Sequence, residues 1–220
     1  ITTIDAEEIL RETAALSAQG HGICVGRPVP GLQVQVIPQQ ANAITDWSDV
    51  APLPQGQIGE IVAQGQLVTE RYHGRDEATH MAKITETDSV TGATRIWHRT
   101  GDVGYFDTQG RLWFCGRIRH IVYYNGQPFY SVQAEEIINA EADIWRSALV
   151  NVQMGQQSQL AIVHEPHAEY RLQITTERQQ QLLQRLQQYG FPVRLSFLFP
   201  RAFPVDRRHN SKIERHELAD

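Results

Sequence analysis

The chain has 220 residues, which is enough for one large domain or two small ones. Its 20 basic and 25 acidic residues give a net charge of −5 and form no cationic stripe, so we expect no nucleic-acid partner. No apolar run approaches the roughly 20 residues that cross a bilayer, and Cys24 and Cys115 are too few for a secreted disulfide framework, so the sequence predicts a cytoplasmic protein with two buried thiols and no membrane span.

The first half of the chain is expected to be rich in strands. A helix is predicted over 5–17, because Asp5 can cap its start and Glu8 can complete a capping box. Apolar residues alternate with glutamines over 32–36, which is typical of a strand with one buried face. Further along we expect a surface loop over 38–56, strand pairing around 57–66, a short helix within 72–83, and two strands over 96–114 joined by a turn at 107–110.

The order of elements changes beyond Gly116-Arg117, where we expect a domain boundary. After it the sequence predicts a strand over 121–124, a turn at 125–126, a helix from 131, strands around 148–152 and 160–163, a helix over 176–189, a strand near 194–199 and a polar tail from 204. Because strands and helices alternate without a repeated βαβ rhythm, we favour an α+β fold.

Several catalytic motifs are absent from the sequence. It contains no GxxxxGK[ST] phosphate loop, no GxSxG nucleophile elbow, no HExxH and no EF-hand loop. The run HEPH at 164–167 offers two histidines, but a proline breaks the spacing and no third ligand is evident. We interpret it as a surface loop and expect no metal site.

Lysine is rare in this chain. Of the 20 basic residues, only Lys83 and Lys212 are lysines, so a positive charge is nearly always supplied by arginine. A lysine that stands alone in such a chain is favoured for a role that a guanidinium fills poorly, such as following a developing charge with a compact ammonium on a flexible stem.

Asp102 is a candidate for binding a ribose. It follows a Thr-Gly turn in the run WHRTGDVGY at 97–105, and a carboxylate offers two acceptor oxygens in one plane to two neighbouring hydroxyls. The competing interpretation is an aspartate that satisfies the backbone of a turn.

Four segments, taken in order, resemble the later core motifs of the adenylate-forming superfamily, which includes acyl-CoA synthetases, nonribosomal adenylation domains and luciferases. They are GEIV at 59–62, WHRTGDVGY at 97–105, FCGRIRHIV at 114–122 and FPVDRRHNSKI at 203–213. The resemblance covers nearly the whole chain, but only the last part of the family's length. It implies the end of a large N-terminal domain, a β-barrel-like subdomain at 1–116, followed by a small mobile α+β lid domain at 117–220.

The resemblance also implies roles for single residues. Asp102 would bind the ATP ribose and Arg117 would contact the nucleotide. Arg119 stands at the hinge about which the lid rotates, where Asp or Lys is common in the family. Lys212 would be the catalytic lysine that bridges the carboxylate and the α-phosphate, with Ser211 where glycine is common.

A finer resemblance points to bacterial olefin-biosynthesis enzymes that use ATP to make a β-lactone from a long-chain β-hydroxy acid. It rests on WHR at 97–99, WFCGR at 113–117 and the residues around 204–212. There the substrate's own hydroxyl captures the acyl-adenylate, which suits the altered hinge face, where Tyr123, Pro128 and Tyr130 replace Lys, Arg and Glu.

The implied substrates are ATP with Mg²⁺ and a fatty or β-hydroxy fatty acid, and other enzymes of the same pathway are candidate partners. The family's phosphate loop, adenine-binding segment and most of the acyl pocket would lie before Ile1, so we expect the isolated chain to turn over little or not at all. Two alternatives remain open. One is an acyl-CoA or acyl-carrier ligase, and the other is a non-catalytic lid that docks a partner.

Overall fold

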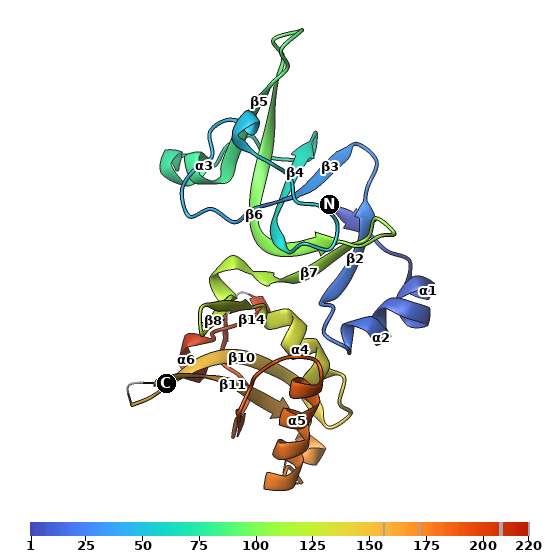
Figure 1. The fold of residues 1–220 in the computed structure, drawn as a ribbon, viewed down its shortest axis with the longest axis vertical. Coiled ribbons are helices and arrows are strands. Elements are labelled where there is room, and N and C mark those ends of the chain that lie inside the picture. Colours follow the sequence, from blue (N-terminus) through green and yellow to red (C-terminus); the bar gives the residue numbers. More distant parts are fainter. Residues whose placement is uncertain (156, 172, 207–208, 220) are drawn as a thin grey trace. The chain divides into compact units, whose positions relative to one another are not determined.

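The computed structural model describes residues 1–155, 157–171, 173–206 and 209–219, and these form two compact units (Figure 1). The first unit contains Ile1–Arg11 and Cys24–Arg119, and the second contains Glu12–Ile23 and His120–Asp220. The expected division after 116, into the end of a large domain and a lid, stays a prediction. Residues 12–23 belong to the second unit although they lie near the start of the chain.

The first helix forms where the sequence predicts it, but it is interrupted. It consists of α1 (Ala6–Glu8), a π-helical turn η1 (Ile9–Thr13) and α2 (Ala14–Ser17). Asp5 caps it by accepting a hydrogen bond from the Glu7 amide at 2.7 Å. The expected capping box is wrong, because the Glu8 carboxylate instead lies 3.2 Å from Arg27 and 3.3 Å from Arg111.

The first unit is built on one curled sheet. Its strands are β1 (Thr2–Thr3), β2 (Ile23–Pro28), β3 (Leu32–Ile37), β4 (Gly59–Gly65), β5 (Lys83–Thr87), β6 (Thr94–Phe106) and β7 (Leu112–Arg117). They lie in the order β1-β2-β7-β6-β4-β3, and β5 also pairs with β6. The long strand β6 bends along its length (Figure 1), so that one end pairs with β5 and the other with β7.

Both faces of this sheet are covered. Residues 59–63 of β4 are all buried, and they contribute to two hydrophobic clusters, with Ile61 in one and Val62 in the other. The loop over 38–56 covers the second cluster, where Trp47 of the 3-10 turn η2 (Trp47–Asp49) stacks on Trp97 with ring centroids 4.1 Å apart. A short helix, α3 (Asp76–Ala82), precedes β5 as expected.

The predicted hairpin between β6 and β7 is present. The Asp107 carboxylate accepts hydrogen bonds from the amides of Gln109 and Arg111, both at 2.9 Å, which fixes the turn. Cys24 and Cys115 are free and buried, and burial raises the pKa of both thiols. This agrees with their interpretation as buried thiols.

The second unit packs helices on a small sheet. After the 3-10 turn η3 (Ile118–His120) come β8 (Val122–Tyr124), β9 (Gln127–Phe129), α4 (Ser131–Asn139), β10 (Ile144–Met154), β11 (Gln157–Pro166), the turn η4 (Ala168–Tyr170), α5 (Thr176–Gln188), β12 (Leu195–Leu198), β13 (Val205–Asp206), β14 (His209–Ile213) and α6 (His216–Ala219). β10 and β11 are antiparallel, whereas β11 and β12 are parallel and are joined through α5. One βαβ crossover thus occurs within this otherwise mixed α and β unit.

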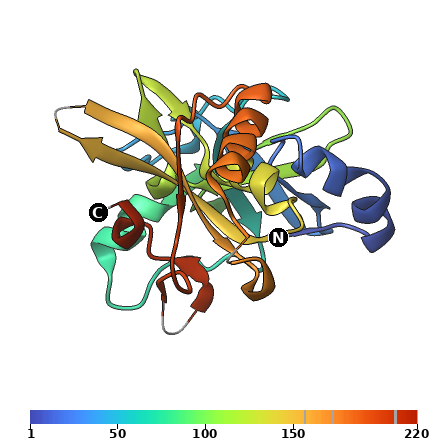
Figure 2. The same ribbon diagram turned by 90° about the horizontal axis from the view of Figure 1, so that it is seen from below.

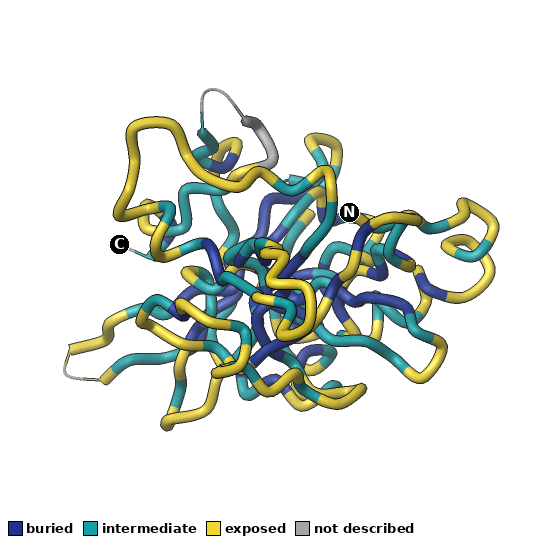
Figure 3. The backbone as a smooth tube through the Cα atoms, turned by 90° about the horizontal axis from the view of Figure 1, so that it is seen from above, coloured by how far each residue is buried: buried dark blue, intermediate teal, exposed yellow. Residues whose placement is uncertain are grey.

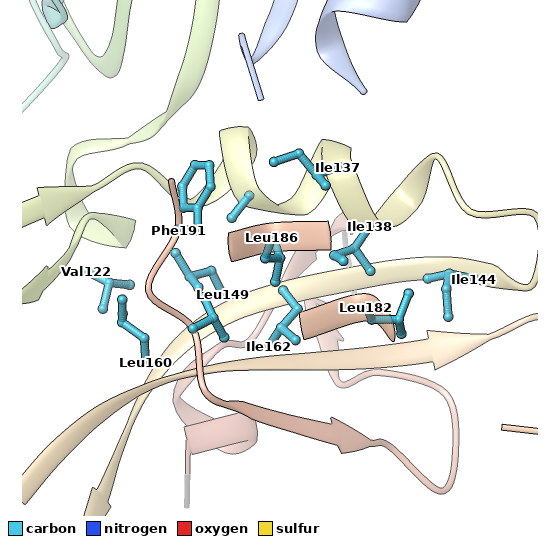
Figure 4. Close-up of a cluster of buried hydrophobic side chains, with 12 residues drawn as sticks. Val122, Ile137, Ile138, Ile144, Leu149, Leu160, Ile162, Leu182, Leu186 and Phe191 are labelled. Atoms are coloured by element: carbon cyan, nitrogen blue, oxygen red, sulfur yellow. The ribbon is translucent and has the colours of Figure 1, made fainter. Parts of the chain in front are cut away.

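Hydrophobic side chains from α4, α5 and the sheet form the core of the second unit (Figure 4). Leu182 and Leu186, from the predicted apolar face of α5, are fully buried against Leu149 and Ile162 of the sheet, and α5 lies across the strands (Figure 2). A Cβ on Gly20 would lie 3.0 Å from Ile137, so the segment 12–23 fits closely against α4. Buried, intermediate and exposed stretches alternate along the backbone (Figure 3).

One expectation for the second unit is wrong. His164 and Glu165 lie in β11 and are buried, at 0% and 6% exposed, and do not form a surface loop. The polar tail carries an apolar anchor, since Leu218 is buried in one cluster with Phe203, Ala148 and Val163.

Candidate active site

Asp102 and Arg117 face each other across two neighbouring strands. They are direct partners in the pairing of β6 with β7. The pairing of β6 with β4 shifts register between Glu60/Val103 and Val62/Arg99, and Gly101 takes a φ of +72° within that shift. Such bulges re-aim side chains and are frequent beside functional sites. The bulge thus lies directly beside Asp102, the partner of Arg117.

The two side chains form an ion pair. Arg117 Nη1 lies 3.1 Å from Asp102 Oδ1, and the side chains are 47% and 26% exposed. Oδ1 itself is buried, and its contact with the guanidinium is an ion pair without hydrogen-bond geometry. Because a quarter of the Asp102 side chain is exposed, the carboxylate can accept a hydrogen bond from a ligand hydroxyl, such as those that a ribose offers.

Burial raises the pKa of Asp102, and the Arg117 guanidinium opposes the rise. The raised pKa means that the site weakly disfavours the charged carboxylate in the absence of a further donor. A further hydrogen-bond donor to the Asp102 carboxylate would favour the ionised form and lower its pKa again.

The turn before Asp102 is held by the Thr100 hydroxyl and not by the Asp102 carboxylate. The Asp102 amide donates to Thr100 Oγ1 at 3.1 Å, and Thr100 Oγ1 donates to the Ile61 carbonyl at 2.8 Å. The hydroxyl of Thr100 thus holds the turn, a task that the competing interpretation gave to the aspartate. The Asp102 carboxylate, whose side chain is 26% exposed, pairs with Arg117 instead of holding the turn.

A buried arginine supports the strand that carries Asp102, and the sequence analysis missed it. Arg99 donates to Glu60 Oε2 from Nε at 3.0 Å and from Nη2 at 2.7 Å. It also donates to the carbonyls of Gln40 at 2.6 Å and Asn42 at 2.9 Å. Arg99 was quoted in the run WHR without a role, and the alternation of β6 puts it on the same face as the buried Trp97.

Lys212 belongs to the second unit and lies on β14, where its side chain is exposed. Ile213, the next residue, is partly buried against the cluster that contains Phe203. Because side chains alternate along a strand, the packing of Ile213 inward turns Lys212 outward.

Arg119 lies in η3, and the division between the two units falls between Arg119 and His120. Its assignment as a hinge stays a prediction. Tyr123, which follows on β8, is 59% exposed.

The described residues were compared with the ligand arrangements of metal sites and with the length of membrane-spanning helices. Within the described ranges, no group of three or more His, Cys, Asp or Glu side chains is arranged to hold a metal ion. Over the same ranges, no helix is long and apolar enough to cross a membrane.

Comparison with known proteins finds relatives that are named synthetases and ligases. It is 40% identical over 225 residues to an olefin β-lactone synthetase of Stenotrophomonas maltophilia, covering 100% of this chain and 39% of the relative. It is 39% identical over 211 residues to an olefin β-lactone synthetase of Xanthomonas campestris, covering 96% of this chain and 38% of that relative. Coenzyme A ligases are more distant relatives. No family model matches the chain.

The fold agrees with solved structures. The O-succinylbenzoate coenzyme A synthetase of Bacillus subtilis, solved with ATP and a magnesium ion, matches 100% of this chain and 38% of its own, with a TM-score of 0.71 and 18% identity. This match shows that the fold is shared. By sequence, the chain is related along nearly its whole length to the olefin β-lactone synthetases, of whose length it spans about two fifths, and more distantly to acyl-CoA ligases of the AMP-forming family.

Proposed function

We propose that the natural protein containing this chain is an AMP-forming ligase that activates a β-hydroxy fatty acid and closes it to a β-lactone. The observation that carries the proposal is the pairing of Asp102 with Arg117, which places a partly exposed carboxylate beside a half-exposed guanidinium at one point of the sheet. The two relatives named olefin β-lactone synthetase support the choice of acid and product.

In this proposal Asp102 accepts hydrogen bonds from the ribose of ATP and Arg117 contacts the nucleotide. The substrate carboxylate attacks the α-phosphorus, the bond to the β-phosphate oxygen breaks, and pyrophosphate leaves. Lys212 stabilises the extra negative charge on the phosphoryl oxygens during this step, because an ammonium on a flexible stem can follow that charge. Residues 117–220 act as a mobile lid that delivers Lys212, with Arg119 at the hinge.

The second half-reaction uses a group of the substrate. The β-hydroxyl oxygen attacks the acyl carbon, loses its proton, and displaces AMP, which closes the four-membered lactone ring. Mg²⁺, when bound, neutralises charge on the phosphates, and its ligands are expected in residues outside this chain. We expect the chain by itself to have little turnover.

The test is pyrophosphate release by the natural full-length protein with ATP and a long-chain β-hydroxy acid. We expect Lys212→Ala to lower kcat by about 10²–10³-fold, which is the usual effect of removing one group that stabilises transition-state charge. Arg194→Ala is the matched control, because Arg194 is an exposed basic residue of the same unit without an assigned role. Equal activity of Lys212→Ala and the unmodified protein would remove the catalytic assignment.

The same assay separates the alternatives. Supplying coenzyme A and observing a thioester in place of a lactone would identify an acyl-CoA ligase. Absence of pyrophosphate release with ATP and any carboxylic acid tried would favour a lid that binds a partner without catalysis.

A further inference from the structure

Two buried carboxylates hold the two ends of the segment that carries Lys212. The segment, here called the lysine segment, runs from Phe203 to Arg215 and includes the hairpin of β13 and β14; 207 and 208 fall outside the described residues. Glu165 holds its first end and Glu135 its last. Both glutamates are 6% exposed.

At the first end, the Phe203 amide donates to Glu165 Oε2 at 2.8 Å. Arg146 Nε donates to the same oxygen at 2.7 Å, and the Arg146 guanidinium lies 5.4 Å from the centre of the Phe203 ring. Phe203 is 3% exposed. The chain thus enters the lysine segment from a point fixed by both packing and a charge-assisted hydrogen bond.

At the last end, Arg215 forms a two-pronged ion pair with Glu135 of α4. Its Nη2 donates to Glu135 Oε2 at 2.9 Å, and its Nη1 donates to Glu135 Oε1. The same Oε1 accepts the Leu149 amide at 2.9 Å, so one carboxylate ties helix α4, strand β10 and the lysine segment together. The side chains of Arg215 and Glu135 are 16% and 7% exposed. This is a two-pronged pair of the kind that fixes orientation as well as position.

Lys212 lies only three residues before Arg215. Between them, Ile213 packs toward the core and the Glu214 amide donates to the Pro204 carbonyl at 2.9 Å, which closes the base of the hairpin. A rotation or slip at Arg215 would therefore be passed to Lys212 through a short, hydrogen-bonded strand.

We propose that Glu135 and Arg215 are positioning residues for Lys212, setting the orientation from which its ammonium reaches the reacting phosphate. This inference rests on the proposed function, because it assigns to the pair an effect on the step in which Lys212 acts. Neither residue is given a contact with substrate.

The experiment measures pyrophosphate release by the natural full-length protein carrying Arg215→Ala, alone and combined with Lys212→Ala. We expect Arg215→Ala to lower kcat by about tenfold or more with the KM for ATP nearly unchanged, because small displacements of a catalytic group are costly. In the Lys212→Ala background, the same substitution should change kcat by less than about twofold, since residues acting as a unit are not additive.

Arg178→Ala is the matched control. Arg178 forms a comparable ion pair in the same unit, 2.6 Å from Asp143 and 2.7 Å from Glu141, but it lies outside the lysine segment. We expect it to lower the melting temperature as Arg215→Ala does while keeping kcat. If Arg215→Ala does not fold, Glu135→Gln gives the same comparison, because it removes the charge and keeps the shape.

The outcomes are distinct. Loss of kcat in Lys212→Ala with full activity in Arg215→Ala would overturn the positioning role and leave the proposed function standing. A loss in Arg215→Ala that is equally large in the Lys212→Ala background would show a general structural effect, which also overturns the inference. Full activity of Lys212→Ala would overturn both proposals.

Discussion

Glu60 and Arg99 form a buried ion pair inside the first unit. One oxygen of Glu60 accepts from both Nε and Nη2 of Arg99, and the side chains are only 3% and 7% exposed. Because Arg99 lies three residues before Asp102, the pair fixes the strand on which the candidate ribose ligand is carried.

Glu60→Gln should destabilise the protein by about 3–5 kcal/mol, because it leaves a buried guanidinium without its counter-charge. The matched control is Glu7→Gln, which breaks the exposed pair with Arg11 and should cost less than about 0.5 kcal/mol. Urea unfolding at neutral pH measures both. Similar midpoints for the two variants would show that the Glu60 and Arg99 pair contributes little.

Asp102→Asn should raise the melting temperature at neutral pH and weaken ATP binding. The folded-state pKa of Asp102 is raised by burial, so its contribution to stability is present below its unfolded pKa and is lost as pH rises through the folded pKa. Asparagine carries no charge and removes this cost at neutral pH. Calorimetric melting and ATP titration, each of the natural full-length protein, measure the two effects.

Asp88→Asn is the control of opposite sign. Hydrogen bonds from the amides of Thr91 and Val90 lower the pKa of Asp88, so its stabilisation is present above its unfolded pKa and is lost as pH falls. We expect this variant to melt at a lower temperature at neutral pH. A lower melting temperature for Asp102→Asn as well would contradict the assignment of Asp102 as a destabilising binding residue.

His164 should make the protein sensitive to mild acid. Burial lowers its pKa to about 4, Asp143 opposes and Arg178 reinforces the shift, and its Nε2 is buried without a hydrogen-bond partner. Because the folded pKa is depressed below the ordinary 6.5, the stability from neutral His164 is present above that value and is lost as pH falls toward about 4.

The measurement is the urea midpoint between pH 7 and pH 4.5 for the unmodified protein, His164→Leu and His216→Leu. His164→Leu should flatten the decline, because leucine has no proton to bind. His216, whose side chain is 74% exposed, provides the control, and its variant should follow the unmodified protein. An unchanged decline in His164→Leu would assign the acid sensitivity to other groups.

Gly104→Ala should disturb the pairing of the two strands that carry Asp102 and Arg117. A Cβ on Gly104 would lie 2.2 Å from the carbonyl oxygen of Trp113, so β7 would have to move. We expect a loss of about 1–3 kcal/mol, as for other overpacked sites, together with weaker ATP binding.

Gly110→Ala separates this clash from backbone strain. Gly110 has open space around its Cβ position and a φ of +72°, so alanine there should cost about 1–2 kcal/mol through strain alone and should leave ATP binding unchanged. Normal ATP binding by Gly104→Ala would mean that the strand pairing tolerates the shift.

Much of the local structure follows from the sequence. The alternation over 32–36 predicts β3, the turn residues at 107–110 predict the hairpin, and the apolar face of α5 predicts its buried leucines. These features depend on neighbours within a few residues, where side-chain direction is set by strand or helix geometry. The sequence also singled out Asp102, Arg117 and Lys212 through their motifs, although their roles stay predictions.

The tertiary structure alone decided which distant side chains meet. Arg99 and Glu60 are 39 residues apart and Arg215 and Glu135 are 80 apart, and no local pattern links either pair. Glu8 satisfies every sequence rule for a capping box, yet its carboxylate lies beside Arg27 and Arg111, because the order of strands brings those guanidinium groups within reach. Local periodicity fixes which face a residue occupies, whereas sheet order and register determine what that face encounters.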